Sequence, residues 1–469
     1  MLTEFLVSLL PIRGEMLNEL GIASFKAGRP RIAAAFLSHA IKVAPEFGSA
    51  IYNLGLVLQH QNQFDRAIAC FQRAIELGTL QAEAENNLGV IHLKLGQLDD
   101  AARRFNNALR RDPSHANART NLAHVLDESG FHEEALKNYA SVIRQHPGHV
   151  EAHFGLGLQH LKSGHWKPGW LEYEWRFQRS PRAQADLIPP VPEAQRWSGQ
   201  SLVGKRILLR AEQGLGDSIQ FCRFAATLHA MGARVCLSVQ KPLVGLLSTV
   251  NGVESVCPLG KERSLGPVDF WSPLLSLPQW LNVSAENVAN EIPYIHIEEE
   301  TLHRWRKRMR STDGRFRVGL AWAGNPTHEN DRNRSMALEQ LASLASANCT
   351  FYSLQCGLCG REARYRSNEL RIVPIAEKFR DFTDTAAVIA NLDLVITVDT
   401  VVAHLAGAMG CPVWTLLPFN SDWRWQLDRD DSPWYPTMRL YRQPNWNNWN
   451  QAIEMVANDL SQLAKDTKI

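Results

Sequence analysis

Small and large apolar residues recur with a period of 34 along the first part of the chain. A leucine followed by a small residue marks the period, at Leu20-Gly21, Leu54-Gly55, Leu88-Gly89, Leu122-Ala123 and Leu156-Gly157. Thirteen residues after each leucine stands Ala or Gly, and four further on a large side chain: Leu37, Phe71, Phe105, Tyr139 and Tyr173. Pro45, Pro113, Pro147 and Pro181 close four units, because proline lacks an N–H and disfavours a helical residue before it. The pattern predicts five helix pairs.

After residue 204 the pattern changes to short apolar runs that alternate with amphipathic stretches. Strands are predicted at 206–211, 235–239, 316–322, near Phe351, at 392–398 and at 413–417. Helices are predicted from about Ser218 to Met231, from Ala337 and near Thr385. Apolar strands separated by helices indicate parallel sheets covered on both faces. We expect two such sheets with a cleft between them.

Composition and charge narrow the class of protein. The 469 residues are 45% apolar and 21% charged, with a formal charge of +2, which provides no global field for nucleic acid or an anionic membrane. The apolar stretch at 5–12 is interrupted by Ser8 and Pro11 and lacks the flanks of an export signal. No run reaches the roughly 18–20 apolar residues that span a bilayer. We expect a cytoplasmic protein without integral membrane association, with its eight cysteines reduced.

The 34-residue units resemble the tetratricopeptide repeat. The resemblance covers about residues 14–181, and the fifth unit departs from it, with Gly169 and Arg176 in small-residue positions. It implies a solenoid, assigned to 1–181, whose concave groove binds a protein or peptide. Asn53, Asn87 and Asn121 stand once per repeat before the leucines. Their amides either form a ladder that holds a peptide backbone or are merely solvated.

A connector is predicted between the two halves. Residues 182–204 are rich in Arg, Pro and Ala and include Pro189, Pro190 and Pro192, a composition typical of a semi-rigid linker. Trp170, Tyr173, Trp175 and Phe177 precede it at helical spacings. They are expected to pack the last repeat against the next domain rather than to bind a ligand.

Two turns in the second half fit anion binding. Ligands of parallel sheets lie beyond the carboxyl ends of the strands, where helix N-termini offer N–H groups to phosphate. One turn is GLGD, residues 214–217, where Gly214 and Gly216 allow a ligand close to the backbone. The other follows the apolar run that ends at Asp399, where a helix begins at Thr400.

These motifs resemble the heptosyltransferase-like branch of the two-domain GT-B glycosyltransferases. They are the GLGD turn, VGLAWAGNP at 318–326 with Asn325 in its loop, and DTVVAHLAGAMG at 399–410. The whole chain also resembles bacterial proteins that fuse tetratricopeptide repeats to such a domain. The resemblance implies two Rossmann-like halves, an acceptor-side half at 205–312 and a nucleotide-sugar half at 313–469. The family usually has glycine two places after the aspartate, where Val401 stands here.

The resemblance assigns roles to individual residues. Asp217 becomes the candidate base, with helix capping as the alternative. Arg334, with Arg332 as an alternative, is expected on the donor phosphates. The backbone N–H groups at Thr400, Val401, Val402 and Ala403 are expected to receive the diphosphate, with a bond from His404, which is otherwise a core histidine. Asp399 is expected to cap the helix or reach a ribose, and Glu362 is placed near the nucleoside or else on a helix surface. The segment 422–425 forms a pocket floor or packs its two indoles.

Three further signals carry little weight. Cys356 and Cys359 form a lone CxxC without the partners of a zinc site. Asp428, Asp430 and Asp431 follow no strand of the first nucleotide half and are expected to form a surface turn. The basic stretch HRWRKRMR at 303–310 lacks the aromatic platform of a nucleic-acid site, so a solvated helix face is expected.

The sequence therefore predicts an α-solenoid followed by a GT-B glycosyltransferase. The expected activity is inverting and metal-independent transfer of a sugar from a nucleotide-diphosphate sugar to a protein or peptide held by the repeats, without a cofactor. A non-catalytic scaffold with a nucleotide-sugar module, or a nucleotide-sugar epimerase or hydrolase, remain alternatives. The donor, the acceptor and the oligomeric state are left open by the sequence.

Overall fold

The computed structural model describes residues 13–181, 184, 191, 193–288, 292–309, 314–328, 330–365, 370 and 372–466. The chain divides into two compact units, Met1–Leu156 and Gly157–Ile469. Pro189, Pro190 and Pro192 of the predicted linker, and the start of the chain before Arg13, lie outside the described residues.

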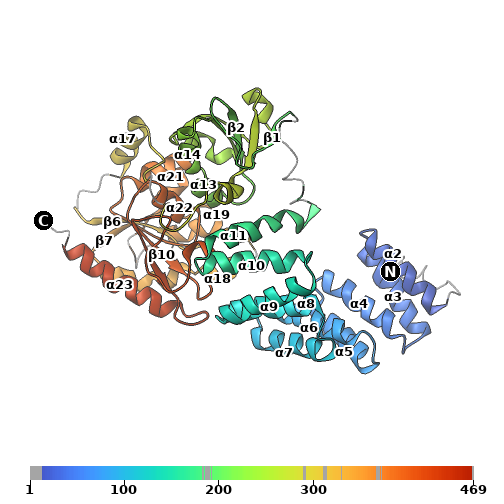
Figure 1. The fold of residues 1–469 in the computed structure, drawn as a ribbon. Coiled ribbons are helices and arrows are strands. Elements are labelled where there is room, and N and C mark those ends of the chain that lie inside the picture. The colour runs from blue at the N-terminus through green and yellow to red at the C-terminus, as the bar shows by residue number, and fades with distance from the viewer. Residues whose placement is uncertain are drawn as a thin grey trace. The chain divides into compact units, whose positions relative to one another are not determined.

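The first unit is a row of antiparallel helix pairs (Figure 1). The helices are α2 (Gly14–Lys26), α3 (Pro30–Val43), α4 (Gly48–His60), α5 (Phe64–Glu76), α6 (Gln81–Lys94), α7 (Leu98–Arg111), α8 (Ala116–Glu128), α9 (His132–Gln145) and the start of α10 (Val150–Lys162). The predicted small-to-large contact is confirmed. A Cβ atom added at Gly89 would lie 2.5 Å from the Phe105 ring, so only glycine permits this approach.

The three asparagines of the predicted ladder join neighbouring repeats. Asn53 Nδ2 donates to Asn18 Oδ1, and Asn121 Nδ2 donates to Asn86 Oδ1, both at 2.9 Å. Asn87 Nδ2 donates to the Tyr52 hydroxyl at the same distance. The amides are therefore neither merely solvated nor wholly free, because one N–H of each stabilises the stack. The amide oxygen and the second N–H of each of these asparagines are the groups that would hold a peptide backbone. This role stays a prediction.

The second unit begins inside α10 and includes the second helix of the fifth repeat, α11 (Trp166–Tyr173). Trp166 stacks on Trp434 with ring centroids 5.0 Å apart, and Trp170 meets Trp423 edge-on at 5.2 Å. The prediction that these aromatics pack the last repeat against the next domain is confirmed for Trp170. Arg176 departs from the repeat pattern because its buried guanidinium forms an ion pair with Glu212 at 3.0 Å.

Two parallel sheets form the rest of the second unit. The first has the order β1-β5-β2-β3-β4, and the second β11-β10-β9-β6-β7-β8. The first contains β1 (Gln195–Arg196), β2 (Arg206–Arg210), β3 (Arg234–Val239), β4 (Val253–Pro258) and β5 (Phe270–Pro273). The second contains β6 (Phe316–Ala321), β7 (Cys349–Ser353), β8 (Ile372–Val373), β9 (Leu394–Val398), β10 (Val413–Leu417) and β11 (Met438–Arg442). The fold class predicted from the sequence is confirmed.

Two predicted helices differ from their prediction. The helix expected at Ser218–Met231 is two helices, α13 (Leu215–Phe221) and α14 (Phe224–Ala230). They separate where Arg223 Nε donates to the Gln220 carbonyl at 2.9 Å, an oxygen that a continuous helix would pair with the residue 224 N–H. The helix expected from Ala337 is the 3₁₀ segment η5 (Leu338–Ser346), whose apolar Leu338, Leu341 and Leu344 are three residues apart and therefore face the core together.

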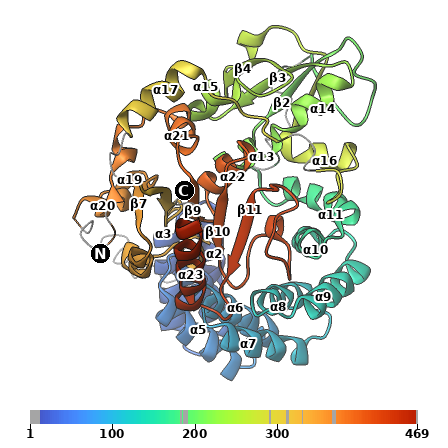
Figure 2. The same cartoon turned by 90° about the vertical axis from the view of Figure 1, so that its left-hand side faces the viewer.

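Helix α22 (Val401–Ala408) packs against α13, so the two halves meet at the predicted turns (Figure 2). Small residues permit this approach. A Cβ atom at Gly216 would lie 2.7 Å from His404 Cδ2, and one at Gly407 would lie 2.4 Å from the Tyr435 ring. The second sheet is also flanked by α21 (Phe382–Ile389), which packs against α17 (Glu299–Arg308), and by α23 (Trp449–Asp466), which packs against η5. The GLGD turn and the turn after β9, which were both predicted to bind an anion, therefore lie next to each other.

Candidate functional site

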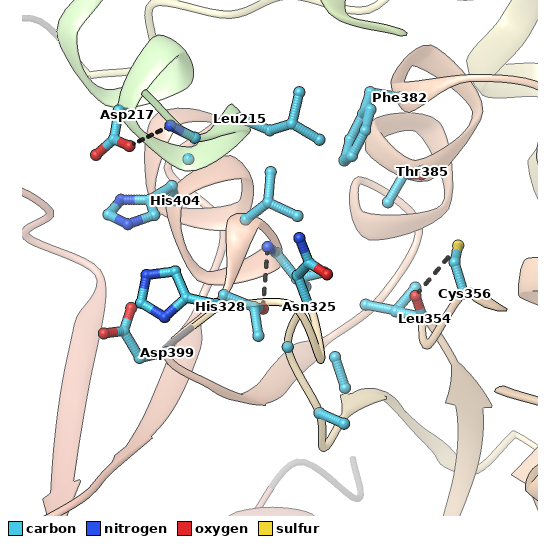
Figure 3. Close-up of a pocket in the computed structure, with 18 of the residues that line it drawn as sticks. Leu215, Asp217, Asn325, His328, Leu354, Cys356, Phe382, Thr385, Asp399 and His404 are labelled. Carbon is cyan, nitrogen blue, oxygen red and sulfur yellow. Dashed lines mark hydrogen bonds between the residues drawn. The ribbon is translucent and has the colours of Figure 1, made fainter. Parts of the chain in front are cut away.

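A cavity of about 760 Å³ lies where the two halves of the second unit meet. The GLGD turn borders it from the first half, and the loop after β6 and the start of α22 border it from the second. Figure 3 shows Asp217, His404, His328 and Asp399 along one side, and Phe382, Thr385 and Cys356 along the other. The cavity therefore combines charged groups from both halves with apolar and hydroxyl groups.

Asp217 is the third residue of α13 and lines this cavity. Its Oδ2 accepts the Gly214 N–H at 2.7 Å. The N-cap residue is Gly214, so Asp217 stabilises the start of α13 from inside the first turn and is not the N-cap that the alternative expected. Its Oδ1 accepts a bond from Arg424 Nη2. The side chain keeps 18% of its exposure, so one edge of the carboxylate still faces the cavity.

Arg424 joins the two halves through its buried guanidinium. Besides Asp217, it donates to Gln220 Oε1 at 2.7 Å and to Asp422 Oδ1 at 2.9 Å. Burial acts to raise the pKa of Asp422, but the Arg424 guanidinium and its hydrogen bonds outweigh burial and lower this pKa. Asp422 and Arg424 line the cavity while Trp423 and Trp425 are buried, so the predicted indole packing is confirmed and the role as floor or lid of a sugar pocket stays a prediction.

The N-terminus of α22 faces the cavity, and Thr400 is its cap. Thr400 has extended backbone, and its Oγ1 accepts the Val402 N–H at 3.2 Å. The prediction that Asp399 caps the helix is wrong by one residue, because the cap oxygen must come from the residue just outside the helical turn. The Ala403 N–H is bonded to the Thr400 carbonyl. Among the described residues this leaves the Thr400 and Val401 N–H groups available to a ligand.

Arg334 reaches the same wall from helix α18 (Asp331–Arg334). Its Nη1 donates to the Asp399 carbonyl at 3.0 Å, and its Nε to Asp331 Oδ1 at 3.4 Å. A Cβ atom at Gly324 would lie 2.8 Å from Arg334 Nη2, so the glycine of the loop makes room for the guanidinium. Asn325 also lines the cavity, and its Oδ1 accepts the Thr327 N–H at 3.1 Å.

Asp399 lies at the carboxyl end of β9 with its side chain toward the cavity. Burial and the nearby Asp422 carboxylate raise its pKa, and the Arg334 and Arg424 guanidinium groups offset only part of this effect. A carboxyl group that is partly protonated near neutral pH can donate a hydrogen bond as well as accept one. Asp399 is therefore suited to meet a hydroxyl group or a weakly charged oxygen.

His404 is buried one turn into α22. Its Nδ1 lies 3.0 Å from the Tyr435 hydroxyl, and its ring stacks on Trp425 with centroids 5.3 Å apart. Burial, together with the Arg424 charge, lowers the pKa of His404 to about 3, so the ring is neutral at physiological pH. It is a packed core residue that also lines the cavity, so the core alternative is confirmed and a bond to the diphosphate stays a prediction.

His328 is a cavity residue that the sequence analysis missed. Its Nδ1 accepts the Asn330 N–H at 3.2 Å, so a neutral His328 carries its proton on Nε2. Burial and the Arg334 charge lower its pKa, which favours this neutral form. Its position three residues after Asn325, inside the donor-half loop, was the available signal.

Several other predicted residues do not line the cavity. Glu362, Ala403 and Arg332 are not among its lining residues. Cys356 lines it and Cys359 does not, and both are free thiols. Asp431 pairs with Arg429 in a turn, as expected for a surface turn. Within the described residues, no group of three or more His, Cys, Asp or Glu side chains is placed to hold a metal ion.

Comparisons with known proteins find matches both for the helical repeats and for the α/β region of the chain. Models described as "Tetratricopeptide repeat" match residues 48–114, 92–137 and 120–166. A model described as "Glycosyltransferase family 9 (heptosyltransferase)" matches residues 361–454. The chain therefore carries tetratricopeptide repeats in its N-terminal part and a glycosyltransferase family 9 domain in its C-terminal part.

Individual relatives add detail. Protein FlbA of Caulobacter vibrioides is 28% identical over 330 residues, which are 65% of this chain and 54% of that protein. The chain thus spans about half the length of this relative. A MamA double mutant is 18% identical with a TM-score of 0.31, covering 34% of this chain and 91% of that structure. YrrB, described as a repeat protein with an unusual peptide-binding site, is 22% identical with a TM-score of 0.27, covering 37% and 87%. Across the described part of the chain, no helix is long and apolar enough to cross a membrane.

Proposed function

We propose that this protein is an inverting, metal-independent glycosyltransferase that moves a sugar from a nucleotide-diphosphate sugar to a protein or peptide acceptor. The observation that carries the proposal is the large cavity between the halves, which the GLGD turn and the family 9 half border together. A candidate base and a candidate phosphate site therefore face each other across one space.

The donor half supplies groups for the leaving diphosphate. In sugar transfer the bond to the diphosphate breaks and negative charge develops on its oxygen. Arg334, the Thr400 and Val401 N–H groups and the positive end of the α22 dipole all lie on this wall. We propose that they stabilise this charge in place of a metal ion, and that the raised pKa of Asp399 lets its carboxyl group meet a donor hydroxyl.

Asp217 is the proposed base on the opposite side. An acceptor hydroxyl becomes more acidic as its oxygen bonds to the sugar, so a carboxylate can take the proton late in the step. Its bond to Arg424 fixes the direction of the carboxylate. The bond to the Gly214 N–H does the same from the helix side.

The same two bonds favour a second candidate, a non-catalytic scaffold that binds nucleotide sugars. Both oxygens of the Asp217 carboxylate already accept hydrogen bonds, so neither is wholly free for a substrate proton. This candidate predicts nucleotide binding without release of diphosphate, and no effect of Asp217→Asn on any activity.

The deciding experiment is a panel of nucleotide sugars incubated with the full-length protein. Free nucleoside diphosphate and protein-bound sugar are measured with and without lysate of the source, and with EDTA. The proposal expects diphosphate release coupled to labelling of a discrete protein, insensitive to EDTA. Nucleotide binding without release under any condition would favour the scaffold, and release without an acceptor would favour a hydrolase or epimerase.

The repeats are the proposed acceptor site, with the asparagine ladder tested separately. Replacing Asn53, Asn87 and Asn121 together by Ala is expected to reduce labelling of a protein acceptor while sparing donor hydrolysis. It removes three inter-repeat bonds, so the free energy of unfolding should also fall by about 1–4 kcal/mol. His124→Ala, at an exposed position on α8, is the control. Equal loss of labelling and hydrolysis would count against the ladder.

A further inference from the structure

A second, smaller cavity in the α/β unit is lined by cationic side chains. Its volume is about 460 Å³, and its lining residues are Arg304 and Arg308 from α17, Lys378 from η6 (Ile375–Lys378), and Arg380 just before α21. Arg306, Lys307 and Arg308 of the basic segment are exposed, as expected for a solvated helix face, and Arg304 and Arg308 also form one wall of this hollow.

A buried carboxylate holds part of this wall in place. Asp384, whose side chain is 2% exposed, accepts bonds from Arg304 Nη2 at 2.8 Å and Arg380 Nε at 3.0 Å. Its Oδ1 also accepts the Trp305 indole N–H at 2.7 Å. Burial opposes ionisation, but these bonds outweigh it and lower the pKa of Asp384 to about 2. The two guanidinium groups are therefore held in position before any ligand arrives.

The cavity carries an excess of positive charge. Asp384 pairs with two of its four cations, and Asp381 also acts on Arg380, which leaves about two uncompensated charges in a chain whose formal charge is only +2. Arg308 lies over the Trp305 ring at 5.0 Å, which fixes it by a cation–π contact. Among the described residues, Arg308 and Lys378 have no carboxylate partner. A concave surface lined by one sign of charge concentrates the opposite ion.

We propose that this cavity is a second anion site, built for a phosphate-type oxyanion. Guanidinium forks bind phosphate oxygens in pairs, and a lysine adds a point charge. Arg380 also lines the large cavity, so the anion is either a free phosphate species or an anionic group carried by the ligand that fills the large cavity. For a free phosphate species the proposal is independent of the proposed function, whereas for a group on the cleft ligand it rests on that function.

The test is calorimetric titration of the full-length protein with pyrophosphate at low salt, against sodium chloride of matched ionic strength. The double variant Arg308→Gln with Lys378→Gln removes two cations without touching Asp384. We expect it to weaken pyrophosphate binding at least tenfold. Lys307→Gln, an exposed neighbour on α17 that does not line the cavity, should change binding less than twofold. Because pyrophosphate can also occupy the proposed phosphate site at α22, the comparison is repeated in an Arg334→Ala background, where the double substitution should still weaken the remaining pyrophosphate binding at least tenfold.

A second titration identifies the source of the anion. With the large cavity saturated by a nucleoside diphosphate, continued pyrophosphate binding indicates a free anion, and competition indicates a group on the cleft ligand. Equal binding by the double variant and the wild type would overturn the proposal, provided that both unfold at the same temperature. Absence of binding beyond that of chloride would overturn it as well.

Discussion

Comparison of Asp217→Asn with Asp422→Asn separates a base from a charge partner. Both carboxylates accept a bond from Arg424 and both line the large cavity. Only Asp217 lies in the GLGD turn, where the proposed function places the base. Each substitution removes one negative charge beside the same guanidinium, so Asp422→Asn is a matched control for the electrostatic effect of Asp217→Asn.

The structure sets the expected size of each effect. Asp217 uses both oxygens, one for Arg424 and one for the Gly214 N–H, and an asparagine can keep only one of these acceptors. We expect Asp217→Asn to lower the free energy of unfolding by about 1–3 kcal/mol. Asp422 accepts both the Arg424 N–H at 3.0 Å and the guanidinium through Oδ1, so an asparagine can keep both bonds and should cost about 1 kcal/mol.

Activity should distinguish the two variants sharply. Loss of a general base lowers the rate of the chemical step by about 10²–10⁴-fold. Asp217→Asn should therefore lower the transfer rate on that scale, while its nucleotide affinity stays within a few-fold of wild type. Asp422→Asn should keep the transfer rate within about tenfold of wild type, which is about 1.4 kcal/mol of activation free energy. Initial rates of diphosphate release with acceptor, calorimetric nucleotide affinity and urea unfolding provide the three measurements. Equal loss of transfer in both variants would refute Asp217 as the base and leave it as a partner of Arg424.

Three further substitutions test the surrounding groups. Arg334→Ala should weaken binding of the nucleoside diphosphate by about 1.5–3 kcal/mol in calorimetry, and unchanged affinity would move the phosphate role elsewhere. Gly216→Ala places a methyl group 2.7 Å from His404 Cδ2, so the free energy of unfolding should fall by about 1–3 kcal/mol in urea titration. The pKa of the Asp399 carboxyl group is about 6 in the folded chain and 3.8 in the unfolded chain. Its contribution to the free energy of unfolding is therefore complete below pH 3.8 and is lost as pH rises through 6. Asp399→Asn should therefore be more stable than wild type at pH 7.5 by about 1–3 kcal/mol, with little difference at pH 3.5, below the unfolded pKa; a constant difference across this range would contradict the raised pKa.

Much of the fold could be predicted because its signals are local. The small-to-large spacing of each repeat depends on residues sixteen apart or fewer, such as Gly89 and Phe105. The apolar runs of β9 and β10 were placed within two residues of their observed bounds. By contrast, β11 was missed, because its sequence MRLYR mixes charged and apolar residues at the edge of the sheet. The break between α13 and α14 depends on the Arg223 side chain, which no periodicity reveals.

The candidate site was predicted in part for the same reason. Local motifs identified Asp217, Thr400 and Arg334, and the structure brings all three to one cavity. Arg424 lies 207 residues from Asp217, so their ion pair depends on tertiary packing that a local pattern does not contain. Glu362 was placed near the nucleoside by resemblance alone, and it is not among the residues that line the cavity.

The ion pair between Arg424 and Asp217 also bears on how the cleft admits a substrate. Arg424 and Asp422 belong to the same segment of the second half and stay paired if the halves separate. Asp217 keeps its bond to the Gly214 N–H within α13. Separation would therefore break the bonds of Arg424 to Asp217 and Gln220 but leave Arg424 paired with Asp422. Asp217 would keep only the neutral Gly214 N–H, so water must solvate its carboxylate if the cost is to stay below the roughly 3–5 kcal/mol typical of an isolated buried charge.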